Sequence, residues 1–256
     1  MVRENKSKGK KEIALLEIFT SIDGEAFHSG QPTVFVRTFG CNLRCSWCDT
    51  SECFDEEHFK KVYPNEELMW MTADEIFTKV LEMEKNWTYR SICLTGGEPL
   101  VEENKEFMTE LISKFCDKGF AVNIETNGSI DYSYWRNKFP LPQEVDMYGN
   151  RCGVTLITDW KLPSSKMSKL MNWDNITKVL THWDIIKCVI SDDPADWEEF
   201  EKICKSGTRA KIFVSPCFGQ VTMNRIPEFV IAHPEYNITA QIQAHKVFWD
   251  PKAKHV

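Results

Sequence analysis

Apolar runs of strand length alternate with helix-like runs along most of this chain, and this alternation restricts the folds open to it. The strand-like runs cover residues 13–19, 33–38, 91–95, 121–126, 153–160, 184–190, 210–215 and 238–243. Helix-like patterns lie near residues 73–85, 103–118, 165–181, 195–206 and 224–232. Strands separated by helices favour parallel βαβ units with right-handed crossovers. The pattern therefore predicts an α/β fold, an incomplete parallel (β/α) barrel of about six strands with loop insertions.

Two of the expected helices carry start signals in the sequence. Thr72 with Glu75 forms the capping-box pattern at the start of the first long helix. Asp193 before Pro194 is a similar signal for the helix over 195–206.

The chain length of 256 residues suits one domain. Residues 1–12 are basic and polar without an apolar core, so they resemble neither a secretory signal nor a membrane anchor. We expect them to form a mobile N-terminal tail before a single domain over residues 13–256. Residues 51–69 and 138–152 fit no regular element and are expected to be insertions or long loops.

Charge and cysteine content narrow the classes of partner. The net charge of -7 argues against a broad surface for nucleic acid or membrane. No apolar run approaches the roughly 20 residues that span a bilayer. Ten cysteines without a signal peptide indicate a reducing, cytoplasmic compartment.

Three cysteines lie within eight residues, directly after the strand-like run over 34–37. Cys41, Cys45 and Cys48 have the spacing C-x3-C-x2-C. Three thiolates can hold three irons of a cubane cluster, whereas a purely electron-transferring cubane usually takes four cysteines. The fourth iron would then be open to a small molecule. The alternative is a structural zinc site with Cys53 or His58 as fourth ligand, although the chain lacks a second C-x2-C pair.

A glycine segment, Thr95-Gly96-Gly97-Glu98-Pro99, ends the strand-like run over 91–95. Two glycines let a backbone approach a ligand closely, and Glu98 can accept from an ammonium group. Taken alone, the segment could equally be a strand-to-loop turn. Together, the cysteine loop and the glycine segment resemble the radical S-adenosylmethionine (SAM) enzymes, in which this segment binds the amino group of the cofactor's methionine.

From about Ile13 onward the chain resembles one family of these enzymes, the 7-carboxy-7-deazaguanine synthases. Five segments carry the resemblance, at residues 21–25, 35–41, 48–50, 159–166 and 243–249. The last two discriminate best, because they are rarer in unrelated radical enzymes than the cysteine loop. The resemblance implies a radical SAM catalytic domain.

The resemblance also implies a reaction, a ring contraction of 6-carboxy-5,6,7,8-tetrahydropterin. Reductive cleavage of SAM gives a 5′-deoxyadenosyl radical, which removes hydrogen from C6 of the pterin. The ring rearranges, hydrogen returns to regenerate SAM, and ammonia leaves to give 7-carboxy-7-deazaguanine. The implied cofactors are a [4Fe-4S] cluster, SAM and Mg²⁺. The implied partners are an electron donor such as a flavodoxin and a second copy in a homodimer.

The site residues are implied in the same way. Cys41, Cys45 and Cys48 would ligate the cluster, and Thr50 would offer a hard oxygen to magnesium. The substrate would be bound by Ile22, Asp23, Gly24, Glu25, Arg37, Thr95, Glu125 and His245. The SAM site would be lined by Trp47, Gly97, Glu98, Asp159, Trp160, Lys161, Ser215, Pro216 and Cys217.

Simple chemistry agrees with several of these roles. Arg37 can hold a carboxylate through two parallel hydrogen bonds. Ionised Glu25 and Glu125 only accept hydrogen bonds, which suits the N–H groups on the amino-pyrimidinone edge of a pterin.

The chain departs from the family pattern in two places. Asp23-Gly24-Glu25-Ala26 stands where many relatives have Gln-Gly-Glu-Gly. Asp23 is shorter and cannot donate when ionised, and Ala26 matters only if its position needs a positive φ. Asp159-Trp160-Lys161 stands where relatives often have Ser-Pro-Lys or Asp-Tyr-Lys, so the aromatic residue differs.

Two other functions remain open on the sequence. An activase that makes a glycyl radical on a partner protein would share the cysteine loop and the glycine segment. It would have no use for Glu25, Arg37 and His245 as a pterin cage. A zinc-stabilised, non-enzymatic interaction protein would be colourless, whereas a cubane is brown.

Cys45→Ala is expected to abolish cluster binding and turnover, because two loop thiolates cannot hold a cubane. Iron analysis after anaerobic reconstitution checks this, with Cys116→Ala in a helical pattern as the control. Retention of about four irons per chain in Cys45→Ala would contradict the cluster assignment.

Overall fold

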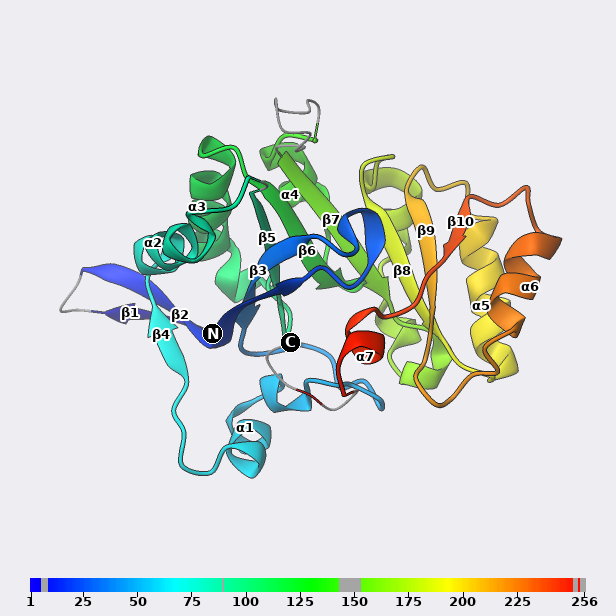
Figure 1. The fold of residues 1–256 in the computed structure, drawn as a ribbon, viewed down its shortest axis with the longest axis horizontal. Coiled ribbons are helices and arrows are strands. Elements are labelled where there is room, and N and C mark those ends of the chain that lie inside the picture. The colour runs from blue at the N-terminus through cyan, green and yellow to red at the C-terminus, as the bar shows by residue number, and fades with distance from the viewer. Residues whose placement is uncertain (6–8, 89, 143–152, 251–252, 254–256) are drawn as a thin grey trace.

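The computed structural model describes residues 1–5, 9–88, 90–142, 153–250 and 253. Within these residues ten strands form one sheet in the order β1-β2-β3-β5-β6-β7-β8-β9-β10, with β4 paired to β2 (Figure 1). The strands are β1 Val2–Asn5, β2 Lys10–Ile22, β3 Pro32–Thr38, β4 Met69–Met71, β5 Ser91–Gly96, β6 Ala121–Asn127, β7 Gly153–Trp160, β8 Ile185–Ile190, β9 Lys211–Pro216 and β10 Ile238–Ala240.

The sheet is parallel from β3 through β10. In the described residues β10 pairs with β9 alone, so the curved sheet stays open. The predicted incomplete parallel barrel is therefore confirmed, with one strand more than expected. Each of the eight predicted strands is present, although β10 is shorter than the run over 238–243.

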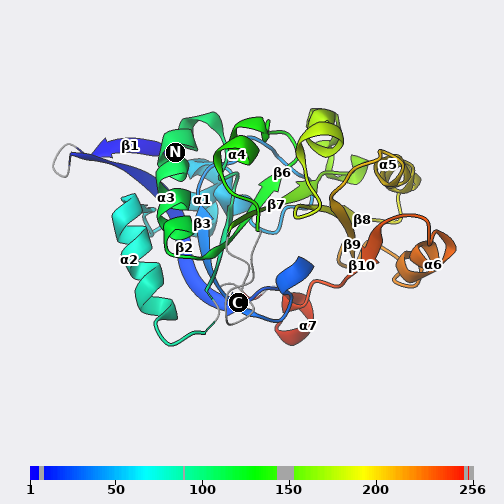
Figure 2. The ribbon, with the colours of Figure 1, turned by 90° about the horizontal axis from the view of Figure 1, so that it is seen from above.

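Helices cover the outer face of the curved sheet. Figure 2 shows α2 to α6 along this outer side, whereas α7 lies at the open side. The helices are α1 Glu56–Val62, α2 Ala73–Glu84, α3 Lys105–Asp117, α4 Ser133–Lys138, α5 Pro194–Cys204, α6 Arg225–Ala232 and α7 His245–Phe248. Apolar faces of α2 and α3, such as Ile76 and Leu111, join the core with β5 and β6 residues such as Leu94 and Ile124. Burial of these side chains drives the helices onto the sheet.

Both predicted helix starts are confirmed. The Thr72 hydroxyl accepts from the Glu75 backbone N–H, and the Glu75 carboxylate accepts from the Thr72 backbone N–H at 2.8 Å. The Asp193 side chain accepts from the Ala195 backbone N–H at the start of α5.

The predicted helix over 165–181 is wrong. Two 3-10 turns, Pro163–Ser165 and Ser168–Leu170, precede a π-helix over Asn175–Val179. Lys166 interrupts the segment with a φ of 66°. The Asn175 amide donates to the carbonyl oxygen of Ile130 at 2.6 Å. This segment therefore follows the β6–α4 connection instead of completing a regular α-helix.

The prediction of a mobile tail over residues 1–12 is wrong for the described part of that segment. Val2–Asn5 pairs antiparallel with the start of β2. Arg3 donates to Glu12 at 3.0 Å, and its guanidinium lies 4.0 Å from the centroid of the Trp70 ring. The basic residues thus find partners at the edge of the sheet.

The two unassigned stretches have different outcomes. Residues 51–69 hold a 3-10 turn and α1, and they lead into β4. Within 138–152, residues 143–152 lie outside the described part of the chain. No helix among the described residues is long and apolar enough to cross a membrane.

Thr72→Ala is expected to lower the free energy of unfolding by about 1 kcal/mol, because it removes the N-cap of α2. Thr78, exposed within the same helix, provides the matched control. Thr78→Ala is expected to be neutral or slightly stabilising, since alanine has the higher helix propensity. Urea unfolding of both variants checks the difference, and equal stabilities would contradict the capping role.

Candidate functional site

A cavity of about 530 Å³ lies at the carboxyl ends of the parallel strands. Ligands bind at this edge in open α/β sheets, because strand ends and their loops converge there. The predicted site residues that line the cavity are Ile22, Asp23, Gly24, Glu25, Arg37, Cys41, Cys45, Trp47, Cys48, Thr50, Thr95, Gly97, Glu125, Asp159, Lys161 and Cys217. Most of the predicted site residues therefore lie around a single cavity.

The cysteine loop follows β3 and is held by hydrogen bonds from its backbone and side chains to neighbouring segments. The Gly40 N–H donates to the Cys53 carbonyl oxygen at 2.9 Å, and the Ser46 hydroxyl donates to the Ser164 carbonyl oxygen at 2.8 Å. The Trp47 indole N–H donates to the Ser164 hydroxyl at 3.3 Å. The loop is thus fixed between β3 and the segment that follows β7.

The three loop thiols suit a multinuclear cluster. All three line the cavity, and burial raises the pKa of Cys41 to about 11, so its free thiol is protonated and iron must displace the proton. In the described part of the chain no three His, Cys, Asp or Glu side chains converge as ligands for one metal ion. A cubane instead places each thiolate on a different iron.

The proposed fourth ligands of a zinc site lie elsewhere. The His58 imidazole Nδ1 is 2.6 Å from Asp55 Oδ1. Cys53 is fully buried and is not part of the cavity lining, and burial raises the pKa of its thiol to about 12. This arrangement disfavours the zinc interpretation.

The glycine segment packs directly against the cysteine loop. The Gly97 N–H donates to the Thr38 carbonyl oxygen at 3.0 Å, and the Glu98 N–H donates to the Gly40 carbonyl oxygen at 2.9 Å. A Cβ on Gly97 would lie 2.2 Å from the Gly40 carbonyl oxygen. The glycines are therefore required by the contact between two backbones, in addition to any ligand.

Glu98 lies behind the cavity wall. Its carboxylate accepts from the Leu100 N–H, the Thr126 hydroxyl and the Asn127 N–H, at 2.9, 2.7 and 2.6 Å. The side chain is fully buried, and burial raises its pKa to about 7. Glu98 thus fixes the end of β6 in this structure.

The substrate loop, named here for the predicted substrate residues Asp23, Gly24 and Glu25, contains a strained residue at its next position. Ala26 has a φ of 63°, a conformation that favours glycine. The departure from glycine therefore matters here, and it costs about 1–2 kcal/mol of backbone strain. The Ala26 N–H donates to Gln241 Oε1 at 2.8 Å, which holds the strained turn against the C-terminal segment.

Asp23 is buried in the same loop. Its Oδ1 accepts from the Glu25 N–H at 3.1 Å. Burial and the nearby charge of Glu125 raise the pKa of Asp23 to about 7. Near neutral pH this carboxyl is partly protonated and is then able to donate.

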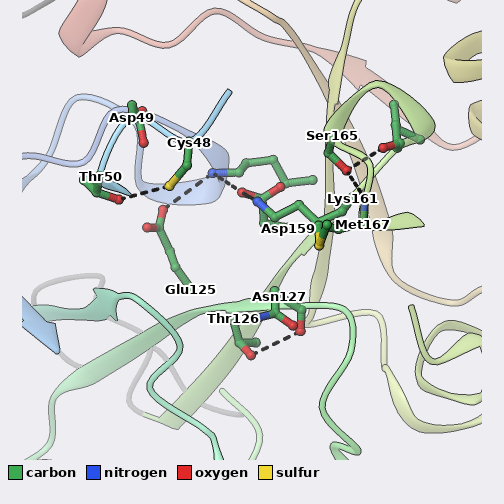
Figure 3. A network of polar contacts seen from close by, with 12 residues as sticks. Cys48, Asp49, Thr50, Glu125, Thr126, Asn127, Asp159, Lys161, Ser165 and Met167 are labelled. Carbon is green, nitrogen blue, oxygen red and sulfur yellow. Dashed lines mark hydrogen bonds and ion pairs between the residues drawn. The ribbon is translucent and has the colours of Figure 1, made fainter. Parts of the chain in front are cut away.

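Lys187 was not predicted, and it lies among the carboxylates of the site (Figure 3 shows Glu125, Asp159 and their contacts). Its ammonium Nζ is 2.7 Å from Glu25 Oε2 and 3.8 Å from both Glu125 Oε1 and Asp159 Oδ2. The available signal was a single cation within the otherwise apolar run over 185–190. A charge at such a position needs buried partners.

Arg37 and Thr50 line the cavity with partners of their own. Arg37 Nε donates to Glu17 Oε1 at 2.7 Å. Thr50 Oγ1 lies 3.8 Å from Cys48 Sγ, and Figure 3 shows these two side chains next to each other.

Only some of the residues predicted to line the SAM site are part of the cavity lining. Asp159 Oδ2 pairs with Lys161 at 2.8 Å, while its buried Oδ1 has no hydrogen-bond partner among the described residues. This orphaned acceptor fits a ligand that carries donors. Trp160 packs instead in the core, edge-on to Trp173.

The remaining predicted residues lie at the end of β9 and at the start of α7. Ser215 is buried and donates to Glu25 Oε1 at 3.1 Å, so it supports the substrate loop. Pro216 ends β9 and is absent from the cavity lining as described, whereas Cys217 is part of it. His245 begins α7, and its side chain lies outside the described part of the structure.

The C-terminal segment closes one side of the cavity. From this segment only His245 was predicted as a site residue. The Ala244 N–H donates to the Gly24 carbonyl oxygen at 3.1 Å. Lys246 lines the cavity, and its Nζ is 3.8 Å from Asp49 Oδ2 in the cysteine loop.

Comparison with known proteins agrees with this geometry. Residues 35–139 match the model of the Radical SAM superfamily. A 7-carboxy-7-deazaguanine synthase of Clostridium acetobutylicum is 33% identical over 94% of this chain and 98% of its own length. Synthases of Methanospirillum hungatei and Thermoplasma acidophilum are 32% and 31% identical, over 91% and 92% of this chain and 83% and 96% of their own lengths.

Two solved structures share the fold. The crystal structure of QueE from Escherichia coli has a TM-score of 0.62 at 20% identity, over 90% of this chain and 94% of that chain. Streptococcus suis SuiB bound to S-adenosylmethionine has a TM-score of 0.51 at 16% identity, over 80% of this chain and 45% of that chain.

Gly97→Ala is expected to lower the free energy of unfolding by about 1–3 kcal/mol and to reduce the iron bound, because the new Cβ must displace the Gly40 backbone. Gly207→Ala is the control without a steric clash: nothing lies within 4 Å of its Cβ, and its φ of 72° adds backbone strain that is absent at Gly97, so its iron content should stay normal even where its stability falls. Iron analysis and urea unfolding check both variants. Normal iron content in Gly97→Ala would show that the cysteine loop does not depend on this contact.

Proposed function

We propose, because this chain belongs to the 7-carboxy-7-deazaguanine synthase family of the radical SAM superfamily, that it contracts the ring of 6-carboxy-5,6,7,8-tetrahydropterin. The product would be 7-carboxy-7-deazaguanine, released with ammonia, as a step of deazapurine or queuosine biosynthesis. One observation carries the proposal: a single cavity joins three loop thiols to the carboxylates of Glu25, which is buried, and Glu125, which is partly exposed. Such a cavity offers both a cluster site and acceptors for a nitrogen heterocycle.

The cofactor half of the site would hold the cluster and SAM. Cys41, Cys45 and Cys48 are soft ligands for three irons. When bound, the cluster and SAM supply radical chemistry that removes and returns one hydrogen atom of the substrate. Asp159, whose Oδ1 has no hydrogen-bond partner among the described residues, and Gly97 both line the cavity and would offer an acceptor and room for the cofactor.

The substrate half would hold the pterin through charged and polar groups. Glu25 and Glu125 accept from its N–H edge, and the Thr95 hydroxyl orients Glu125 through a hydrogen bond of 2.7 Å. Arg37, fixed at Nε by Glu17, keeps its other N–H groups for the substrate carboxylate. Thr50 would offer its hydroxyl to Mg²⁺, which would supply positive charge for the substrate carboxylate.

The partners and location belong to the same proposal. A one-electron donor such as a flavodoxin and a homodimeric assembly follow from the family resemblance. The nine described cysteines are all free, which supports a reducing, cytoplasmic location for an oxygen-sensitive cluster.

The test is anaerobic turnover of the reconstituted protein with 6-carboxytetrahydropterin, SAM, magnesium and a reductant, followed by mass spectrometry. Formation of 7-carboxy-7-deazaguanine without proportional consumption of SAM is the expected result. Cleavage of SAM to 5′-deoxyadenosine without that product would retain the radical chemistry but reject the substrate.

Thr50→Val is expected to weaken the magnesium dependence of turnover, because valine keeps the shape of threonine but lacks the hard oxygen ligand. Thr50→Ser, which keeps the hydroxyl, is the matched control and should respond to magnesium like the wild type. Titration of the rate with MgCl₂ measures the effect. An unchanged response in Thr50→Val would remove Thr50 from the metal site.

A further inference from the structure

Lys187 lies at the boundary between an apolar layer and a charged layer inside the sheet. Ile157 and Ile185, two residues nearer the amino ends of β7 and β8, form a small buried cluster with Phe213. Lys187 has Phe213 as its neighbour in the register of β9. Its neighbour in the register of β7 is Asp159. The aliphatic part of the Lys187 side chain therefore packs beside apolar residues, and only its ammonium group reaches the carboxylates that line the cavity.

The ammonium connects carboxylates that come from three separate parts of the chain. Glu25 follows β2, Glu125 belongs to β6 and Asp159 belongs to β7. Within the described residues, Lys187 is the only side chain that forms an ion pair with Glu25 or Glu125. Without it, these two acids and Asp23 would be negative charges collected at one partly buried site.

The charge of Lys187 is stable in this environment. Its side chain is 8% exposed. Burial alone lowers the pKa of Lys187, but Glu25, Glu125 and Asp159 together raise it well above the ordinary value. The residue is thus a permanent cation at the pH of the reaction.

Both glutamates keep acceptor capacity for a ligand. A carboxylate has about four lone-pair sites. Glu25 accepts from Lys187 at Oε2, and from Ser215 at 3.1 Å and Gln241 at 3.5 Å at Oε1. Glu125 accepts from Thr95 at Oε2. By this count one lone pair of Glu25 Oε2 and most of the Glu125 carboxylate are left for a ligand, and both residues line the cavity.

We propose that Lys187 is a positioning residue for the substrate, which holds Glu25 and Glu125 turned toward the cavity so that both accept from the N–H edge of a bound nitrogen heterocycle. This inference rests on the proposed function, because the heterocycle is the pterin and its deazaguanine product. It assigns to Lys187 no contact with the reacting carbon. Its effect passes through the two glutamates, so it should appear in ligand affinity more than in the maximal rate.

The experiment compares Lys187→Met and Lys211→Met in the reconstituted enzyme. Lys211 belongs to β9 and bonds to Asn237, away from the cavity lining, so it controls for loss of a sheet lysine. For Lys187→Met we expect the Kd of 7-carboxy-7-deazaguanine, measured by anaerobic calorimetry, and the KM of the pterin to rise at least about tenfold. The Kd of SAM and the iron content should stay within about twofold of the wild type, because the thiols and the Asp159–Lys161 pair are retained.

A double-mutant cycle tests whether Lys187 acts through Glu25. In the Glu25→Gln background, Lys187→Met should raise the product Kd much less than it does alone, because the neutral amide no longer needs the ammonium. Additive effects would overturn the inference. Product affinity in Lys187→Met equal to that of Lys211→Met would also overturn it, as would a loss confined to SAM binding.

Two further results keep the outcomes separate. If Lys187→Met does not fold, Lys187→Arg and Lys187→Gln decide: the inference requires the charged variant to bind product more tightly, and equal binding rejects it. If the wild-type enzyme forms no deazaguanine from the pterin and does not bind the product, the proposed function fails before any variant is compared. Wild-type turnover with an unaffected Lys187→Met variant rejects the role of Lys187 alone.

Discussion

The backbone of the glycine segment after β5 lies directly on the backbone of the cysteine loop after β3, and the site is built around this contact. Gly97 and Glu98 donate to the carbonyl oxygens of Thr38 and Gly40. Parallel pairing of β3 with β5 brings the two segments to the same edge of the sheet. A side chain at Gly97 would separate them. Gly96 and Gly97, the glycines that allow this approach, also line the cavity, so the geometry of the cofactor half depends on backbone packing.

The substrate half depends on a different principle, the pairing of buried charges. Glu25, Glu125 and Asp159 carry more negative charge than the low-dielectric interior would tolerate alone. Lys187 and Lys161 compensate it, and Ser215 and Gln241 both donate to Oε1 of Glu25. Pairing of this kind restricts the arrangement of its members, and it leaves Asp159 Oδ1 without a hydrogen-bond partner among the described residues. The cavity thus combines a rigid backbone wall with an ordered charged wall.

The sequence was sufficient for the parts of the fold that follow periodicity. The eight strands, the capping box at Thr72 and the placement of three cysteines in one loop at a strand end were all predictable, because each depends on local pattern and parallel topology. The helix expected over 165–181 failed, since its polar side chains bond across to Gly128 and Ile130 instead of supporting helical turns. The spacing of apolar residues along a sequence does not indicate hydrogen bonds between distant segments.

The charged wall was harder to predict for the same reason. Glu25 and Glu125 entered the predicted site through family resemblance, whereas Lys187 was hidden within an apolar strand. Its role depends on which acids the register brings opposite to it. The positive φ of Ala26 was likewise invisible, because alanine does not indicate a left-handed turn.

The bonds from Gln241 to the substrate loop have a consequence for how the enzyme is assembled. They join residues 215 and 216 positions apart, whereas the glycine segment and the cysteine loop are separated by fewer than 60 residues. Contacts between distant parts of a chain form slowly, because a long loop must close before they contribute. We therefore expect the cluster pocket to form early and the substrate wall late. During that interval the thiols remain open to incoming iron, so the order of folding itself provides a time window for loading the cluster.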